Sequence, residues 1–218
     1  LRANTTGANN TAVGGIGQNS KAPLHSNTTG GYNVAVGNQA LATNTTGNYS
    51  TAIGYQSLYL NTADNNVSVG LNSMYNNSTG TDNVSIGTNT MDSNTTGSNN
   101  TAVGRNALGA NTTASNNTAV GTSAMGNNTT GDAGVSVGKS TLTSNTTGRF
   151  NTGCGYEALY SNTTGGYNTA LGQFAVGANT TGTYNVGFGN NALAGVTTGN
   201  YNVGSTRGGE AITTGDGN

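Results

Sequence analysis

Residues 162–178 read NTTGGYNTALGQFAVGA, and Asn179 begins another NTTG directly afterwards. A second motif of the type Asn-Thr-Ala-Val-Gly lies inside each such stretch, and its last residue is called the anchor glycine below. The anchor glycines are Gly14, Gly37, Gly54, Gly70, Gly87, Gly104, Gly121, Gly138, Gly155, Gly172 and Gly189. Successive anchors are 17 residues apart, except for an interval of 23 after Gly14 and one of 16 after Gly54. The chain is therefore a 17-residue repeat, with a six-residue insertion between Gly14 and Leu24 and a one-residue deletion just after Asp64.

Aligned repeats form columns of similar residues, and these columns predict a strand before each anchor. The residues one and three places before the anchor share a face because strand side chains alternate. The earlier column is β-branched throughout, as a pleated surface prefers. The column just before the anchor is expected to form one side of the core, and consists of Val36, Ile53, Val69, Ile86, Val103, Val120, Val137, Cys154, Leu171 and Phe188.

A second apolar column follows each anchor by four residues and is expected to form the other side of the core. Its leucines are Leu41, Leu58, Leu108, Leu142, Leu159 and Leu193, with methionine or valine in other repeats. Between the two strand columns the residue is always Ala, Ser or Gly, as at Ala102 and Gly153. A face limited to small residues indicates the close approach of another backbone, either from elsewhere in the coil or from another chain.

The repeat predicts an all-β fold, a parallel β-solenoid or β-roll of about 12 coils, with one repeat for each coil. Frequent glycine and the absence of a 3.6-residue period oppose helices, and 17 residues are too few for a propeller blade. We expect one repeat domain over residues 1–218, with a degenerate terminal coil at 200–218. Because the repeat is already in register at Asn4, we expect a mature or internal portion of a protein.

Composition excludes several classes of function. A net charge of −1, with only 6% charged residues, gives no field to attract nucleic acid. No apolar run approaches the roughly 20 residues of a membrane helix, so membrane insertion is not expected. The only histidine, His25, and the only cysteine, Cys154, show no convergent partners for catalysis. The carboxylates fall in different columns and form no metal ladder, so we expect no enzyme, cofactor or metal site.

The units Asn100–Leu108 and Asn168–Val176 resemble the repeats of phage tail-fibre proteins and the heads of trimeric autotransporter adhesins. The resemblance rests on Asn-Thr-Ala-x-Gly, Ala-Leu and Asn-Thr-Thr-Gly at fixed spacing, from about Asn4 to Gly199. It implies an extracellular, cell-surface or virion fibre in which parallel chains pack as a homotrimer. The 17-residue period is longer than the adhesin unit, and the chain shows no coiled-coil stalk or membrane anchor.

Three polar or aromatic features have more than one interpretation. Tyr32, Tyr49, Tyr167 and Tyr184 share a column that could stack on sugars or pack laterally against another chain. Paired threonines such as Thr95 and Thr96 raise ice binding, although adjacent strand residues point oppositely. The Asn-x-Ser/Thr sequons either carry glycans or form a turn ladder, and include Asn27, Asn44, Asn94, Asn111, Asn128, Asn145, Asn162 and Asn179.

These features favour a structural fibre segment that self-associates as a homotrimer or filament. The alternatives are a ligand-binding solenoid, either a glycan-binding adhesin or an ice-binding protein, and a subunit of a glycan-coated filament. A cell-surface glycan or receptor is the expected ligand of an adhesive face.

Overall fold

The computed structural model describes residues 1, 3–15, 21–206 and 214–217. Two compact units follow each other along the chain, Leu1–Thr113 and Ala114–Asn218. Within the described residues the chain forms short strands and turns without helix, and none of it could cross a bilayer as a helix. The middle of the insertion (16–20) and residues 207–213 of the expected terminal coil lie outside the described residues.

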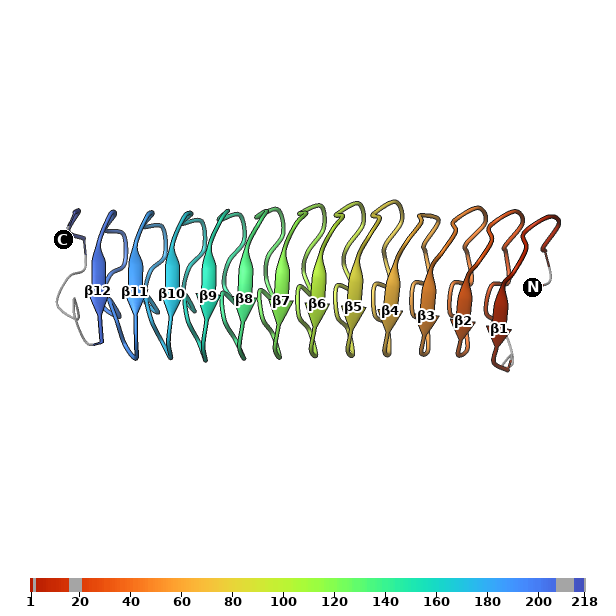
Figure 1. The fold of residues 1–218 in the computed structure, drawn as a ribbon, viewed down its shortest axis with the longest axis horizontal. Helices are drawn as coiled ribbons and strands as arrows, with labels where there is room; N and C mark the ends of the chain where they lie inside the picture. The colour runs from red at the N-terminus through yellow and green to blue at the C-terminus, as the bar shows by residue number, and fades with distance from the viewer. Residues whose placement is uncertain (2, 16–20, 207–213, 218) are drawn as a thin grey trace. The chain divides into compact units, whose positions relative to one another are not determined.

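The first unit contains six three-residue strands that pair in parallel, each with the next along the chain (Figure 1). They are β1 (Thr11–Val13), β2 (Val34–Val36), β3 (Thr51–Ile53), β4 (Val67–Val69), β5 (Val84–Ile86) and β6 (Thr101–Val103). The register places each position of the repeat on the same position of the next, for example Ala35 on Ala52. This stacking confirms the parallel β-solenoid that the 17-residue period predicts.

The second unit repeats this arrangement with strands β7 to β12. They are β7 (Thr118–Val120), β8 (Val135–Val137), β9 (Thr152–Cys154), β10 (Thr169–Leu171), β11 (Val186–Phe188) and β12 (Val203–Ser205). The pairing is again parallel and in register, as where Ala170 lies beside Gly153.

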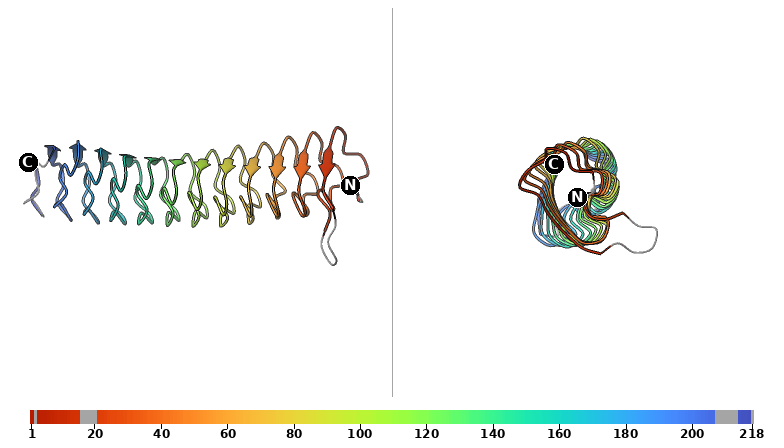
Figure 2. Two further views of the ribbon diagram at one scale, coloured as in Figure 1. Left: turned by 90° about the horizontal axis from the view of Figure 1, so that it is seen from below. Right: turned by 90° about the vertical axis from the view of Figure 1, so that its right-hand side faces the viewer.

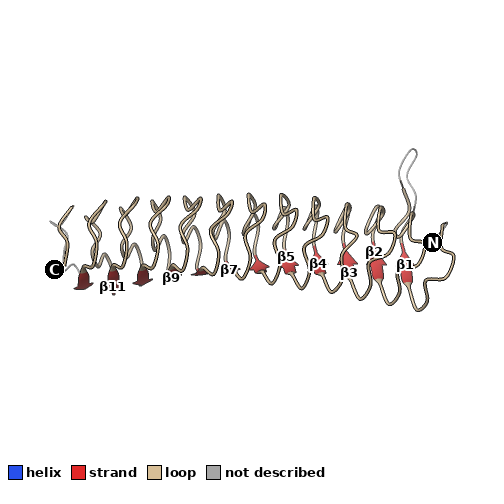
Figure 3. Ribbon diagram, turned by 90° about the horizontal axis from the view of Figure 1, so that it is seen from above, coloured by secondary structure: helices blue, strands red, loops and turns tan. Residues whose placement is uncertain are grey.

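Most of each coil is turn rather than strand, as Figure 3 shows for both units, and the strands lie on one side of the coils (Figure 2). The turns nevertheless bond from coil to coil: the Leu41 amide donates to the Ser57 carbonyl at 3.1 Å, and the Leu58 amide to the Ser73 carbonyl at 3.0 Å. Inter-coil hydrogen bonds therefore continue around the solenoid, which satisfies the turn backbone that the interior would otherwise leave unpaired.

The anchor glycines are fixed by backbone conformation and by their neighbours. Gly121 has φ of +136°, a region that side chains rarely adopt, and a Cβ there would lie 2.5 Å from the Gly138 carbonyl oxygen. Only glycine avoids both penalties. The anchor column is thus a stack of close backbone contacts between successive coils of a unit.

The column of large apolar residues after the anchor forms the core, as the sequence predicts. Leu41, Leu58, Leu108, Leu142 and Leu159 are fully buried, and methionines fill the same place in other coils. The small strand residues face these side chains from the opposite wall. A Cβ added to Gly153 would lie only 2.5 Å from Thr141 Cγ2, so the neighbour that demands small residues is another part of the coil.

The assignment of the other apolar column to the core is wrong. Val36, Val69 and Val103 are only partly buried, while Ile53, Ile86, Val120, Val137, Leu171 and Phe188 are exposed. Cys154, expected to be a buried thiol, is also exposed. The reason is the width of the coil: the leucine column fills the interior, so the strand turns its small residue inward and its two larger residues outward.

Candidate functional site

The outward side of the strands is the first candidate surface, and we call it the outer strand face. It consists of the first and third residues of each strand, β1–β6 in one unit and β7–β12 in the other. Every position is Thr, Val, Ile, Cys, Leu, Phe or Ser, so no charged side chain interrupts it. The middle residue of the strands from β2 to β11 is buried, whereas the flanking residues are half-buried or exposed.

Exposed sheet faces in soluble proteins are ordinarily polar, with the hydrophobic side packed on the core. Here the outer strand face carries the larger apolar residues of the strand, whereas the residue after the anchor glycine varies from Tyr55 and Leu71 to Arg105 and Lys139. Six of the twelve strands place a threonine at the first position of this face, so it is uncharged and mixed rather than wholly apolar. Depletion of charged residues is typical of the centre of a protein interface. The outer strand face therefore combines the absence of charge with exposed apolar side chains.

The asparagines of the Asn-Thr-Thr-Gly motif, unlike the outer strand face, are fully buried. The Asn145 Nδ2 donates to Asn128 Oδ1 at 2.8 Å and to the Gly148 carbonyl at 3.0 Å. Asn162 Nδ2 in turn donates to Asn145 Oδ1 at 2.9 Å. The turn ladder that the sequence left open is thus confirmed as an internal column of hydrogen-bonded side-chain amides.

This burial overturns the interpretation of those asparagines as glycosylation sites. Asn27, Asn44, Asn94, Asn111, Asn128, Asn145, Asn162 and Asn179 are all 0% exposed. A glycan on Nδ2 would replace one of two bonded hydrogens and would need space inside the coil. A glycan-coated filament decorated at these positions is therefore incompatible with the fold.

A second buried amide column precedes the strands, and the sequence-based reasoning missed it. Asn83 Nδ2 donates to the Gly97 carbonyl at 2.9 Å, and Asn83 Oδ1 accepts the Asn100 amide at 2.9 Å. Its signal was the Asn found directly before most strands, which could have been recognised as a third aligned column. The two asparagine columns together supply much of the polar interior of a narrow coil.

The aromatic column is exposed, as the sequence predicts, and its rings stack on one another. In the second unit the ring centroids of Phe150 and Tyr167 lie 4.9 Å apart, and those of Tyr167 and Tyr184 4.8 Å apart. In the first unit Tyr32 and Tyr49 are 5.1 Å apart. Because Tyr167 and Tyr184 each have an aromatic ring on both faces, a sugar cannot stack on those faces.

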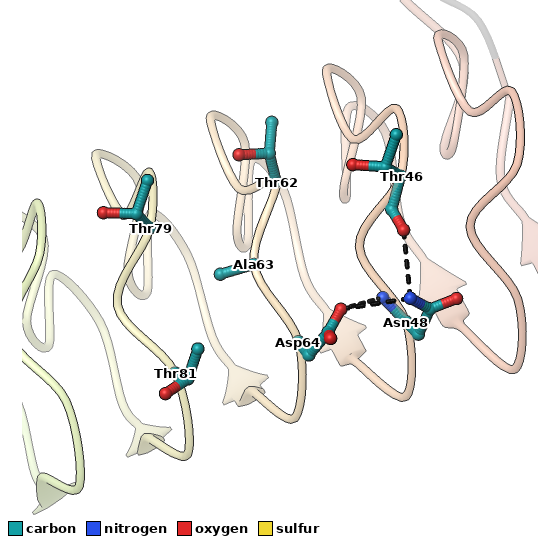
Figure 4. A pocket seen from close by; sticks show the side chains of 7 residues that line it. All are labelled: Thr46, Asn48, Thr62, Ala63, Asp64, Thr79 and Thr81. Carbon is teal, nitrogen blue, oxygen red and sulfur yellow. Dashed lines mark hydrogen bonds between the residues drawn. The ribbon is translucent and has the colours of Figure 1, made fainter.

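The threonines of each motif take different roles. Thr45 is half-buried, and its carbonyl accepts the Thr28 hydroxyl at 3.0 Å, whereas Thr46 is exposed. Around the 16-residue coil, which contains the deletion, the exposed threonines Thr46, Thr62 and Thr79 form a single row (Figure 4). An ice-binding solenoid presents two threonine columns on one flat face, so this row has only half of that pattern.

A groove of about 350 Å³ opens at the 16-residue coil (Figure 4). It is lined by Thr46, Asn48, Thr62, Ala63, Asp64, Thr79 and Thr81. The one-residue deletion lies between Asn61 and Asp64, not just after Asp64, and leaves a single threonine. The Ala63 carbonyl takes the place of the glycine carbonyl of other coils and accepts Asn61 Nδ2 at 2.8 Å. The irregularity in the repeat is therefore the physical origin of the groove.

The groove carries one carboxylate among neutral hydroxyl and amide groups. Asp64 Oδ1 accepts the Asn48 amide at 2.7 Å and Asn48 Nδ2 at 3.2 Å. These bonds fix the carboxylate at the groove wall, and its second oxygen keeps its capacity to accept hydrogen bonds. Such a lining suits a neutral polyhydroxylated ligand better than an anion.

Residues with catalytic potential do not come together in the described part of the chain. His25 is half-buried beside the insertion, and Cys154 lies on the outer strand face of β9. Within the described residues no three His, Cys, Asp or Glu side chains are close enough to hold a metal ion. Arg149 and Asp132 form a surface ion pair at 3.1 Å.

No protein-family model, curated protein or solved structure matches this chain.

Proposed function

We propose that this chain is a structural segment of an extracellular or virion fibre, in which three parallel copies associate through the outer strand face. The observation that carries the proposal is the uncharged face, rich in Val, Ile and Thr, that the strands of each unit turn toward solvent. Burying such a face removes apolar surface from water and leaves no charge to desolvate. The likeness of the repeat to tail-fibre and adhesin-head repeats supports the extracellular or virion location.

The polarity of the threonine side of the coil favours association through the outer strand face instead. The exposed threonine row and the groove beside it are polar, and remain solvated when the outer strand face is covered. A closed ring of identical chains buries one face of every copy, as soluble homo-oligomers commonly do. Parallel chains also place like coils at the same height, so that similar columns meet along the contact.

Two lysine substitutions test this surface. Ile86→Lys places a charge on the outer strand face of β5, while Thr96→Lys places one in the exposed threonine row. Light scattering should show that wild type and Thr96→Lys share one oligomeric mass, whereas Ile86→Lys dissociates, because an interface charge must be desolvated. A monomeric wild type, or an unchanged mass for Ile86→Lys, would contradict the proposal.

The groove favours a second function, binding of a neutral saccharide by the fibre. Its hydroxyl, amide and carboxylate groups are those that bond sugar hydroxyls, and its 350 Å³ volume falls in the range of ligand sites. NMR titration with neutral hexose disaccharides should shift the Asn48 and Asp64 amides, and Asp64→Ala should abolish the shifts. Disaccharides that leave both amides unmoved at millimolar concentration would exclude this function.

A further inference from the structure

The aromatic column puts rings where the backbone favours other residues. Tyr167, Tyr184 and Tyr201 have φ of 60°, 58° and 57°, a left-handed conformation that bulky side chains rarely adopt. In three coils of the first unit the same column has nearly identical φ values but holds Asn65, Asp82 and Asn99, which tolerate this conformation. Local backbone preference therefore does not account for tyrosine here.

The rings in the column form close, nearly parallel phenol pairs. Tyr184 and Tyr201 have centroids 5.0 Å apart and planes at 4°, and Tyr167 and Tyr184 are 4.8 Å apart at 7°. Tyr32 and Tyr49 make a similar pair in the first unit. A further pair, Tyr59 with Tyr75, has centroids 5.1 Å apart and planes at 4°.

The stacked rings are also open to reagents in solution. Tyr32, Tyr49, Tyr167, Tyr184 and Tyr201 are 44–61% exposed, although each has at least one neighbouring ring. A ring in this position is reached by an oxidant at its edge and hydroxyl while its partner stays beside it. Exposed tyrosines such as Tyr55 and Tyr156 lack a stacked phenol in the part of the chain that the structure describes.

We propose that the stacked tyrosines are sites of oxidative coupling, which joins successive coils through dityrosine bonds. A haem peroxidase using hydrogen peroxide removes one electron and one proton from each of two phenols. The two phenoxyl radicals form a carbon–carbon bond between ring positions ortho to oxygen, and the two ring hydrogens move to the oxygens. Overall, two phenols lose two hydrogen atoms, which reduce one hydrogen peroxide to two water molecules.

The stack favours this reaction because the second phenol is already beside the first. Coupling in solution requires two radicals to meet by diffusion, whereas the column holds candidate partners at about 5 Å. Rotation of the exposed side chains then suffices to bring ortho carbons together. Tyr184 has a phenol on each side, so it is the central residue of the second unit, while Phe150 cannot couple and ends the column.

The experiment treats the full chain with a haem peroxidase and hydrogen peroxide, then maps cross-links by proteolysis and tandem mass spectrometry. We expect bonds between Tyr167 and Tyr184 and between Tyr184 and Tyr201, together with Tyr32–Tyr49 and Tyr59–Tyr75. A fraction of chains should carry them while still running as monomers on a denaturing gel. The yield per chain should not depend on protein concentration.

Two variants separate stacking from mere exposure. Tyr184→Phe keeps a ring in the column, as Phe150 does naturally, and should lose both cross-links of the second unit while retaining Tyr32–Tyr49. Tyr156→Phe removes an exposed but unstacked phenol and should leave the cross-link map unchanged. Dityrosine found mainly at Tyr55 or Tyr156, or formed only between chains, would overturn the proposal, and so would a lack of reaction at the stacked pairs. This outcome does not depend on the oligomeric state of the fibre.

Discussion

Inward-facing and outward-facing columns of the same coil differ in the range of residue types that occur in them. In the coil that contains β8, Leu142 and Asn145 point inward and are fully buried, whereas Val137 points outward and is 39% exposed. The inner columns vary little, and Ser68 and Ser85, which stand where other strands have alanine, accept the hydroxyls of Ser57 and Ser73 at 2.8 Å. The outer columns range from Val to Cys and Phe. The geometry of the coil therefore limits the residues of the interior more strictly than those of the outer strand face.

The largest expected effect comes from Asn145→Asp. The carboxylate would face two acceptors, Asn128 Oδ1 and the Gly148 carbonyl, in place of the two bonds that Nδ2 donates. A buried charge that keeps only the Asn162 Nδ2 donor and faces two acceptors should lower the free energy of unfolding by about 3–5 kcal/mol at pH 7. Chemical denaturation measures this loss.

Asn127→Asp is the matched control, because Asn127 is exposed and directly precedes Asn128, the member of the buried column in the neighbouring coil. Its effect should stay within about 0.5 kcal/mol, as for an ordinary surface substitution. If the two variants lose similar stability, the buried amide column does not hold the coil together.

The next comparison sets Leu142→Ala against Val137→Ala. Leu142 is 0% exposed in the core, so truncation should cost about 2–5 kcal/mol. Val137 lies on the outer strand face and should cost below about 1 kcal/mol within the coil. Denaturant unfolding of both variants tests the assignment of the two apolar columns, and a larger loss for Val137→Ala would reverse it.

A substitution at an anchor glycine should have an intermediate effect. In Gly121→Ala, the added Cβ meets the Gly138 carbonyl carbon at 2.6 Å while φ of +136° strains the new residue. We expect a loss of about 2–3 kcal/mol, since strained backbone positions cost on this order. Thermal unfolding compared with the neighbouring Val120→Ala would show whether the backbone contact or general crowding is responsible.

The smallest expected effect concerns Asp92, whose pKa is raised by burial despite backbone hydrogen bonds that lower it. A raised pKa in the folded state means that Asp92 favours folding at low pH, and this contribution disappears as the pH rises through that pKa. Asp92→Asn should therefore raise Tm by about 1 °C at pH 7. Calorimetry near pH 3 should show no difference, and a destabilised variant at pH 7 would contradict the sign.

The sequence predicted the period, the parallel stacking and the leucine core, because aligned columns report them directly. It could not decide which side of the strand faces inward: alternation defines two faces, and the choice depends on how far Leu142 and its equivalents fill the coil. Hydrophobicity alone favoured Val137 over Ser136 as the residue that faces the core, yet Ser136 is the buried one. The groove at Asp64 could not be predicted from the sequence either, since a one-residue deletion produces a groove only through the backbone path of the 16-residue coil.

The most direct test of the outward face as an association surface is the native mass of the particle in dilute solution. Native mass spectrometry should give three times the chain mass for the wild-type protein, with dissociation after Ile86→Lys. A stable monomer would contradict the account, because the uncharged outer strand face would then remain exposed to water.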